Sequence, residues 1–273
     1  MPERILPEMA PPGTRLGTLL PEIAESSGLS SNVPVYATAC HDTAAAVAAV
    51  PAEGDGWCYI SSGTWSLMGV ELDAPVINDQ SLALNFTNEV GAGDKIRFLK
   101  NIAGLWLLQE CRRAWALAGR EYSYEELSKL AASAPPAAAL IDPDAFPEPG
   151  HMPERIAEYC HARGREAPHQ PAGMVRLILE SLAATYRKVL DNLETLLSRR
   201  IHRVHIVGGG SRNQLLNQLA ANATGRTVIA GPSEATAAGN ILVQAIGAGA
   251  VSGIAEAREI VARSFPLQTY QPE

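Results

Sequence analysis

Three turns in the sequence have the residue types that a phosphate site needs: residues 61–64 (SSGT), 208–210 (GGG) and 231–233 (GPS). Glycine lets backbone N–H groups come close to a phosphate, and a helix that starts just after the glycine adds a favourable dipole. The GGG turn lies between a predicted strand and a predicted helix, an order typical of nucleotide sites. It matches neither G-x-x-x-x-G-K-[ST] nor G-x-G-x-x-G, so ordinary loop glycines, and a plain hairpin at SSGT, remain alternatives.

Asp42 is the candidate for acid–base chemistry, because it follows an apolar strand predicted over 33–39 and precedes an alanine-rich helix predicted over 44–50. We expect it to cap that helix, and a capping carboxylate can also serve as a base. Phosphoryl transfer has a loose transition state, so its base needs correct placement more than strong basicity. His41 has two interpretations, a hydrogen-bonded structural histidine or a catalytic one. A Cys40–His41 thiol pair is disfavoured, because adjacent residues of a strand point to opposite faces.

The hydrophobic pattern predicts strands that alternate with helices, which indicates the α/β class. Residues 1–32 are rich in proline and glycine and are predicted to form extended chain or linker. Lys100, Asn101 and Gln109 flank the start of a predicted helix, where by themselves they indicate only polar surface. The other predicted elements are two strands within 57–71, helices over 96–118, 153–162, 172–200 and 212–223, strands over 203–207 and 227–230, and a small-residue helix from residue 235.

Composition excludes several classes of protein. Hydrophobic residues make up 47% of the 273 residues and charged residues 19%, which is enough apolar material for a core and rules out a disordered chain. The formal net charge of −7 argues against a nucleic-acid binder. Four cysteines without a CxxC pair predict neither a zinc site nor disulfides, and with no secretory pattern we expect a cytoplasmic protein. The uncharged stretch 235–255 has too many small and polar residues for a membrane span.

Five segments carry a resemblance to a known family: ACHDTAAAV at 39–47, YISSGTWSLMG at 59–69, LKNIAGLWLLQE at 99–110, VHIVGGGSRNQLLNQLAANATG at 204–225 and AGPSEATAAGN at 230–240. In this order they resemble the rhamnulokinases, which belong to the FGGY carbohydrate kinases. SSGTWSLMG together with the glycine triplet and AGPSEA is more specific than any single turn. The resemblance, from about Pro11 to the C-terminus, implies the actin-like ATPase (ribonuclease H-like) fold.

The resemblance also implies a reaction, the transfer of the γ-phosphoryl group of ATP, with Mg²⁺, to the 1-hydroxyl of L-rhamnulose in L-rhamnose catabolism. Another FGGY kinase, for L-fuculose or a pentulose, and a non-catalytic nucleotide-binding module stay open as alternatives. No residue is implied as a metal ligand. The implied roles are general base for Asp42, sugar binding for His41, Asp42, Thr43 and Asn101, and ATP contact for Thr64, Gln109 and Gly209.

Kinases of this family have two actin-like lobes and about twice this length, so the chain resembles their C-terminal half. We expect residues 1–50 to be a linker with a remnant of the N-terminal lobe, and 51–273 to be the ATP-binding lobe. The Asp-x-Gly phosphate loop of the first lobe has no counterpart before Asp42. The strand over 33–39 and the helix from residue 235 would expose apolar surface, which favours docking of the missing lobe or self-association. We therefore expect severe loss of activity in isolation, because positioning carries most of the catalysis.

Overall fold

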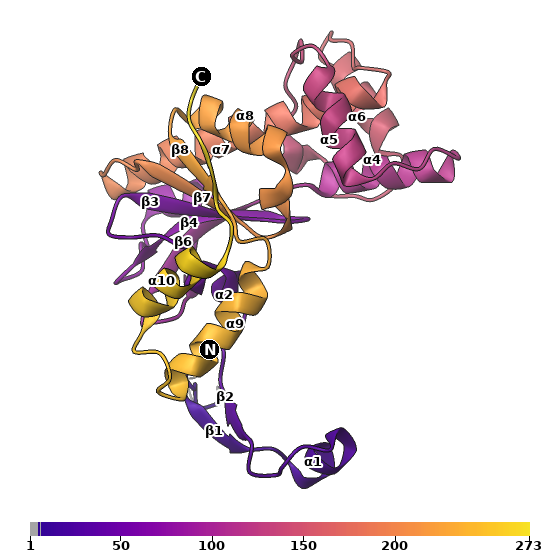
Figure 1. The fold of residues 1–273 in the computed structure, drawn as a ribbon. Coiled ribbons are helices and arrows are strands. Elements are labelled where there is room, and N and C mark those ends of the chain that lie inside the picture. The colour runs from indigo at the N-terminus through magenta and orange to yellow at the C-terminus, as the bar shows by residue number, and fades with distance from the viewer. Residues whose placement is uncertain (1–4, 6) are drawn as a thin grey trace.

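The structure, a computed structural model, describes residue 5 and residues 7–273. Its centre is a seven-stranded sheet with the strand order β5-β6-β4-β3-β7-β8-β9 (Figure 1). Strands β3, β7 and β8 are parallel, and the other neighbours pair antiparallel. The strands are β3 (Trp57–Ser62), β4 (Ser66–Leu72), β5 (Thr87–Val90), β6 (Ile96–Ile102), β7 (Arg203–Val207), β8 (Thr227–Ala230) and β9 (Gln268–Tyr270).

Helices cover both faces of this sheet (Figure 1). One face carries α7 (Pro171–Leu197) and α8 (Gln214–Thr224), and the other carries α2 (Asp42–Ala48), α9 (Ala235–Gly247) and α10 (Ile254–Ser264). Because side chains alternate along a strand, Ile60 of β3 packs into the core under α7, whereas its neighbour Tyr59 packs into the core under α2 and α10. The α/β class is confirmed, with a separate apolar core on each side of the sheet.

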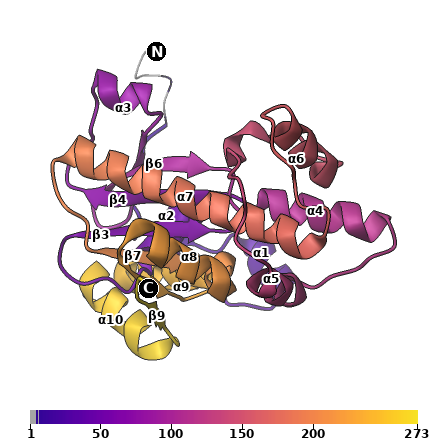
Figure 2. The ribbon, with the colours of Figure 1, turned by 90° about the horizontal axis from the view of Figure 1, so that it is seen from above.

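A helical lobe lies beside the sheet, next to the N-terminal part of α7 (Figures 1 and 2). It consists of α4 (Trp106–Leu117), α5 (Tyr124–Ser133), the 3₁₀ turn η2 (Pro143–Ala145) and α6 (Met152–His161). The indole of Trp106 donates a hydrogen bond to the carbonyl of Phe146 at 3.0 Å, which ties the start of α4 to the loop before α6. This lobe contains the short helix predicted over 153–162, observed as α6, and a further helix, α5, for which the sequence analysis predicts no element.

Most predicted elements are confirmed, but the helix over 96–118 is wrong in its first half. Residues Ile96–Ile102 form β6, which pairs with β4 over its full length, and the helix begins only at Trp106. Pairing with β4 places this segment inside the sheet, where Phe98 and Leu99 are fully buried in the cores on its two opposite faces. Tertiary packing therefore overrides a pattern that is compatible with a helix. A short helix, α3 (Asp79–Ala83), lies in the connection between β4 and β5.

The N-terminal segment is an arm that extends away from the main sheet (Figure 1). It has more structure than the extended chain or linker predicted for residues 1–32, because β1 (Arg15–Thr18) pairs with β2 (Pro34–Tyr36), within the predicted strand 33–39, and α1 (Pro21–Ser27) lies between them. Strand β2 pairs with β1 alone, in a separate two-stranded sheet. The arm exposes Leu16, Leu20, Ile23, Leu29 and Val33, as expected for a strand without its larger sheet.

The long uncharged segment from residue 235 also differs from its prediction. Its helix, α9, ends at Gly247, and a separate helix, α10, starts at Ile254 near the end of the uncharged stretch. Within residue 5 and residues 7–273, no helix is both long and apolar enough to cross a membrane. Helix α9 packs closely on α2 with one face, whereas Ile241 on this helix is 65% exposed, so apolar surface is exposed on part of it as predicted.

Candidate active site

All three predicted glycine turns lie at one edge of the sheet. They follow β3, β7 and β8, whose parallel register pairs Ser61 with Val207 and Ile206 with Ala230, so their carboxyl ends meet. The amide of Gly208 donates to the carbonyl of Pro232 at 3.0 Å, which joins the second turn to the third. In open α/β sheets this edge is where ligands bind.

The first two turns are in such close contact that one position of the second turn has no room for a side chain and must be glycine. A Cβ on Gly210 would lie 2.0 Å from the Oγ of Ser62, and Gly208 has a φ of +84°. Gly209 differs, because a Cβ there would meet nothing within 4 Å. The middle glycine is therefore exposed to an open space rather than packed against its own chain.

This open space is a cavity of about 660 Å³, called here the first cavity. It brings together six of the seven predicted site residues, from α2, the β3–β4 turn, β6 and the turn after β7. Ser233, Glu234 and Thr236 close it from the start of α9. The six are His41, Asp42, Thr43, Thr64, Asn101 and Gly209.

Asp42 is the first residue of α2, and the prediction that it is the N-cap is wrong. The N-cap is His41, whose Nδ1 accepts a hydrogen bond from the amide of Thr43 at 3.2 Å. The Oδ1 of Asp42 accepts from the same amide at 2.6 Å and lies 3.0 Å from the Nδ1 of His41. Its side chain is 75% exposed, so the carboxylate faces the cavity at a helix N-terminus, where negative charge is stabilised.

Helix α9 fixes the position of Asp42 by packing closely on α2. A Cβ on Gly239 would lie 1.8 Å from the carbonyl oxygen of Ala45, so the two backbones are in direct contact. The Oγ1 of Thr236 also donates to the carbonyl of Asp42 at 3.3 Å. The small residues of both helices thus determine how far the carboxylate extends toward the turns.

Asn101 takes a different place from the one the sequence predicts, and Thr43 is nearly buried. Asn101 is not at a helix start: it lies near the end of β6, where it pairs with Leu67 of β4. Thr43 is 4% exposed, with its Oγ1 3.5 Å from the Oδ1 of Asp42. The Thr43 side chain therefore contacts the Asp42 carboxylate as well as bordering the first cavity.

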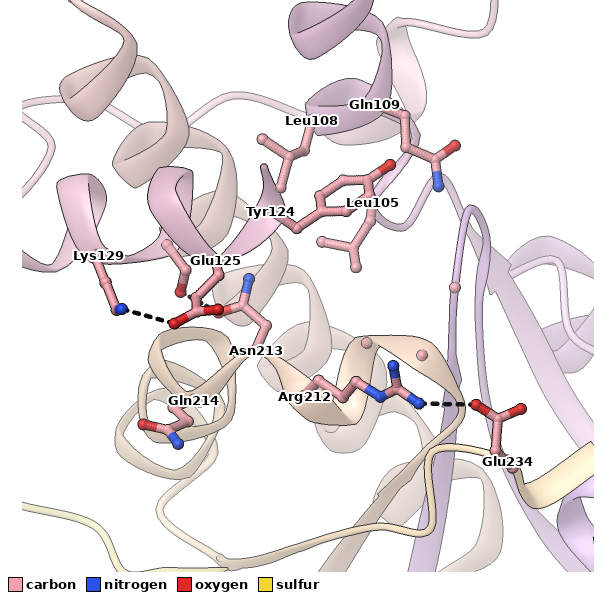
Figure 3. A pocket seen from close by; sticks show the side chains of 14 residues that line it. Leu105, Leu108, Gln109, Tyr124, Glu125, Lys129, Arg212, Asn213, Gln214 and Glu234 are labelled. Carbon is pink, nitrogen blue, oxygen red and sulfur yellow. Dashed lines mark hydrogen bonds and ion pairs between the residues drawn. The ribbon is translucent and has the colours of Figure 1, made fainter. Parts of the chain in front are cut away.

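The seventh predicted residue, Gln109, lies in a second cavity of about 660 Å³ (Figure 3). Its side-chain amide donates to the Oγ1 of Thr64 at 3.0 Å, which links α4 to the β3–β4 turn. The two cavities share Gly63, Gly209 and Glu234, so they adjoin along the glycine turns. A molecule in the second cavity can therefore extend between the glycine turns toward Asp42.

The sequence reasoning missed most of the walls of this second cavity. They come from α4, α5 and the start of α8, and include Leu105, Leu108, Tyr124 and Asn213 (Figure 3). Leu and Tyr side chains offer an apolar slot for a flat ring. Asn213 follows the glycine triplet within four residues and could have been found by that position, whereas nothing in the sequence near Tyr124 indicates the site.

Two exposed ion pairs border the second cavity. Arg212 and Glu234 are 2.8 Å apart, and Lys129 and Glu125 are 2.6 Å apart (Figure 3). The hydrogen bond from Lys129 lowers the pKa of the Glu125 carboxyl, and the same contact raises the pKa of Lys129. Each cation at this opening is thus paired with a carboxylate, so Arg212 and Lys129 can reach a bound phosphate only by exchanging these partners.

Within the described residues, no group of three or more His, Cys, Asp or Glu side chains is placed to hold a metal ion. Two carboxylates, Asp42 and Glu234, line the first cavity. This donor set fits Mg²⁺ that is bound mainly through substrate phosphates and water, since Mg²⁺ often takes only one or two protein carboxylates.

Similarity to known proteins extends over most of the chain. A family model described as the C-terminal domain of the FGGY family of carbohydrate kinases matches residues 58–248. A rhamnulokinase from Bacteroides thetaiotaomicron is 51% identical over 264 residues, which are 96% of this chain and 53% of that protein. A rhamnulokinase from Bacillus subtilis is 42% identical, over 96% of this chain and 54% of that protein. The chain thus spans about half the length of the curated relatives it matches.

Solved structures of sugar and glycerol kinases share the fold. A ligand-bound xylulose kinase from Lactobacillus acidophilus gives a TM-score of 0.70 at 15% identity, covering 100% of this chain and 54% of that one. The glycerol kinase of Plasmodium falciparum with ADP also gives 0.70 at 15% identity, covering 99% and 53%. The fold is therefore the C-terminal lobe of an actin-like ATPase. The chain belongs to the FGGY family of carbohydrate kinases.

Proposed function

We propose that this protein takes part in the ATP-dependent phosphorylation of L-rhamnulose to L-rhamnulose 1-phosphate. The carrying observation is that the cavity holding Asp42 opens, along Gly63 and Gly209, into a second cavity suited to a nucleotide. The relatives that are 51% and 42% identical are named rhamnulokinases, which supports this ketose as the acceptor.

Asp42 is the proposed general base. The 1-hydroxyl oxygen of the ketose forms a bond to the γ-phosphorus, the bond from that phosphorus to the bridging oxygen of ADP breaks, and the hydroxyl proton passes to the carboxylate. Because the transition state is loose, placement matters more than basicity. The hydrogen bond from the amide of Thr43 to Oδ1 and the close packing of Gly239 on Ala45 hold that placement.

The sugar binds in the first cavity, where His41, Thr43 and Asn101 offer hydrogen-bonding groups beside Asp42. ATP binds in the second cavity, with its phosphates along the glycine turns. There Gly209 leaves room for a phosphate, and Thr64, held by Gln109, contacts it. Mg²⁺ bound to those phosphates would face Asp42 and Glu234 and would supply electrostatic stabilisation of the transferring group.

The partner of the exposed N-terminal arm is proposed to be the other lobe of the kinase. The matching family model is a C-terminal domain, and the chain spans about half of its relatives. The arm offers apolar side chains such as Leu20 and Ile23 to such a lobe. Association of two copies of this chain, measured by light scattering, would instead show that the arm serves self-association.

The test is L-rhamnulose-dependent release of ADP from Mg-ATP, measured with the chain alone and with an N-terminal lobe of a rhamnulokinase added. Asp42→Asn keeps the shape and removes the base, and we expect turnover to fall by about 10²- to 10⁴-fold. Asp79→Asn is the matched control, because Asp79 is likewise the exposed first residue of a helix, α3, away from both cavities.

Three outcomes contradict the proposal in different ways. Equal turnover in Asp42→Asn removes Asp42 as the base. Turnover with L-fuculose or a pentulose in place of L-rhamnulose assigns the chain to another kinase of the family. ATP binding without turnover, even with the added lobe, indicates a nucleotide-binding module that is not catalytic.

A further inference from the structure

Trp65 is a large aromatic side chain that the fold leaves exposed at the candidate active site. It is 54% exposed and lines the first cavity together with Asp42 and Asn101. An indole contributes a large apolar area when it is covered, so leaving it uncovered gives up stabilisation. An uncovered Trp at the edge of a ligand cavity therefore has a surface available for the ligand.

The backbone that carries Trp65 is firmly held. The amide of Gly63 donates to the carbonyl of Trp65 at 2.8 Å, and the amide of Trp106 donates to the carbonyl of Thr64 at 3.0 Å. On the other side, Gly104 has a φ of +56°, and a Cβ there would lie 2.5 Å from the carbonyl carbon of Trp65. The exposed indole is thus carried by a turn whose backbone is fixed in place.

Trp65 continues an apolar row that begins in the core under α2. Leu67 of β4, two residues after Trp65 in the chain, packs against that core and also lines the first cavity. Trp65 lies in the turn just before β4 begins, and because both side chains line the first cavity they form one wall of it. Asn101, the register partner of Leu67, places an amide beside this row. One wall of the cavity is therefore apolar, whereas His41 and Asp42 make another part of it polar.

We propose that Trp65, with Leu67, is the specificity-determining wall of the sugar site and packs on the methyl group at C6 of a 6-deoxyketose. This inference rests on the proposed function and deepens it. A methyl group placed on an apolar wall gains from leaving water. A hydroxyl at the same place would lose its water without a hydrogen-bonding partner on the indole face, so a ketose that carries oxygen at C6 is disfavoured.

The test compares two sugars that differ only at C6: L-rhamnulose, which has a methyl group there, and L-fructose, which has a hydroxymethyl group. Saturation-transfer NMR on the 273-residue chain reads which sugar protons lie against the protein. For the wild-type chain we expect the strongest transfer to the C6 methyl protons. We expect Trp65→Ala to lose that enhancement and Trp65→Phe, which keeps an aromatic surface, to retain most of it.

A competition titration measures the preference as a ratio of affinities. We expect Trp65→Ala to reduce the preference for L-rhamnulose over L-fructose by about tenfold or more, the range that one apolar contact provides. Leu82→Ala is the control, because Leu82 is an exposed apolar residue, 78% exposed, on α3 and outside the first cavity. It should leave both the ratio and the methyl signal unchanged.

The experiments can disprove the role of Trp65 and the proposed function separately. If the wild-type chain binds L-rhamnulose and Trp65→Ala keeps the methyl enhancement and the preference, the role of Trp65 is wrong and the proposed function stands. If neither sugar binds the wild-type chain, even when the N-terminal lobe of a rhamnulokinase is present, the proposed function is wrong as well.

Discussion

The two faces of the sheet are built on different principles. Under α7 and α8 the core consists of large aliphatic side chains such as Leu182, Val189 and Ile206, all buried to within 1%. Between α2 and α9 the contacts are made by alanine and glycine, with Gly239 directly against the backbone of Ala45, and larger side chains such as Tyr59 fill the core between the helices and the sheet. The first face stabilises by apolar volume, whereas the second adds a close backbone approach between α2 and α9.

This difference matters because the candidate base is on the second face. Side chains can change rotamer, and a core of large side chains adjusts to small changes. Two backbones in contact have no such freedom, so the distance from Asp42 to the glycine turns is set by residues that carry no functional group. We infer that the small residues of α2 and α9 are there for positioning, in a family whose chemistry depends on it.

The largest expected effect comes from Gly239→Ala. The added methyl group would lie 1.8 Å from the carbonyl oxygen of Ala45, so α9 must move away from α2. We expect a loss of about 3 kcal/mol in the free energy of unfolding, measured by urea denaturation, and loss of L-rhamnulose binding by the folded protein.

Leu182→Ala is the matched change on the other face. It leaves a cavity under α7 and should cost a similar 2–5 kcal/mol, about the usual range for such a truncation. We expect the folded protein to keep its ligand binding. Equal loss of binding in both variants would contradict the distinction between the two faces.

The second face also holds a buried titratable group, His205 on β7. It is 1% exposed, its ring lies 5.9 Å from that of Trp57, and neither ring nitrogen has a hydrogen-bond partner within the described residues. Burial, with smaller contributions from Arg203 and Arg258, lowers the pKa of His205 from 6.5 to about 4. Protonation therefore favours the unfolded chain, where the pKa is higher.

The contribution of neutral, buried His205 to the free energy of unfolding is therefore fully present above about pH 6.5. It is lost as the pH falls toward 4, by up to about 3 kcal/mol. Urea denaturation at several pH values measures this slope. His205→Phe should flatten this slope, whereas His202→Gln, at an exposed position three residues before His205 and outside the core, should leave the slope unchanged. A slope that survives His205→Phe would assign the acid sensitivity to other groups.

The smallest expected effect on stability, with a clear effect on binding, comes from Gly209→Ala. A Cβ at Gly209 meets nothing within 4 Å, so the free energy of unfolding should change by less than about 0.5 kcal/mol. The methyl group would occupy the space between the two cavities, and we expect the affinity for ATP to fall by about tenfold, measured by calorimetry. Unchanged affinity would show that the phosphates do not pass this glycine.

Much of this arrangement could be predicted from the sequence. Strands 203–207 and 227–230, the long helix α7 and the SSGT hairpin follow from hydrophobic pattern and turn residues, and the structure confirms them. The segments around Asp42 and the glycine triplet could be singled out because each follows a predicted strand. A carboxylate there can act as a base, and glycines there can approach a phosphate. The errors in predicted secondary structure, at 1–32 and 96–102, arose where pairing with another strand decides the conformation: β1 pairs with β2 in the arm, and β6 pairs with β4 in the main sheet.

The sequence by itself determined the class of fold and the family and singled out the candidate residues for the chemistry, because these depend on local pattern and on residue type. Only the tertiary structure decided that β3, β7 and β8 bring the three turns to one edge, that α5 and α8 wall the second cavity, and that Trp65 remains exposed. The reason is physical: a cavity is formed by surfaces from segments far apart in the chain, and no local pattern encodes their separation in space.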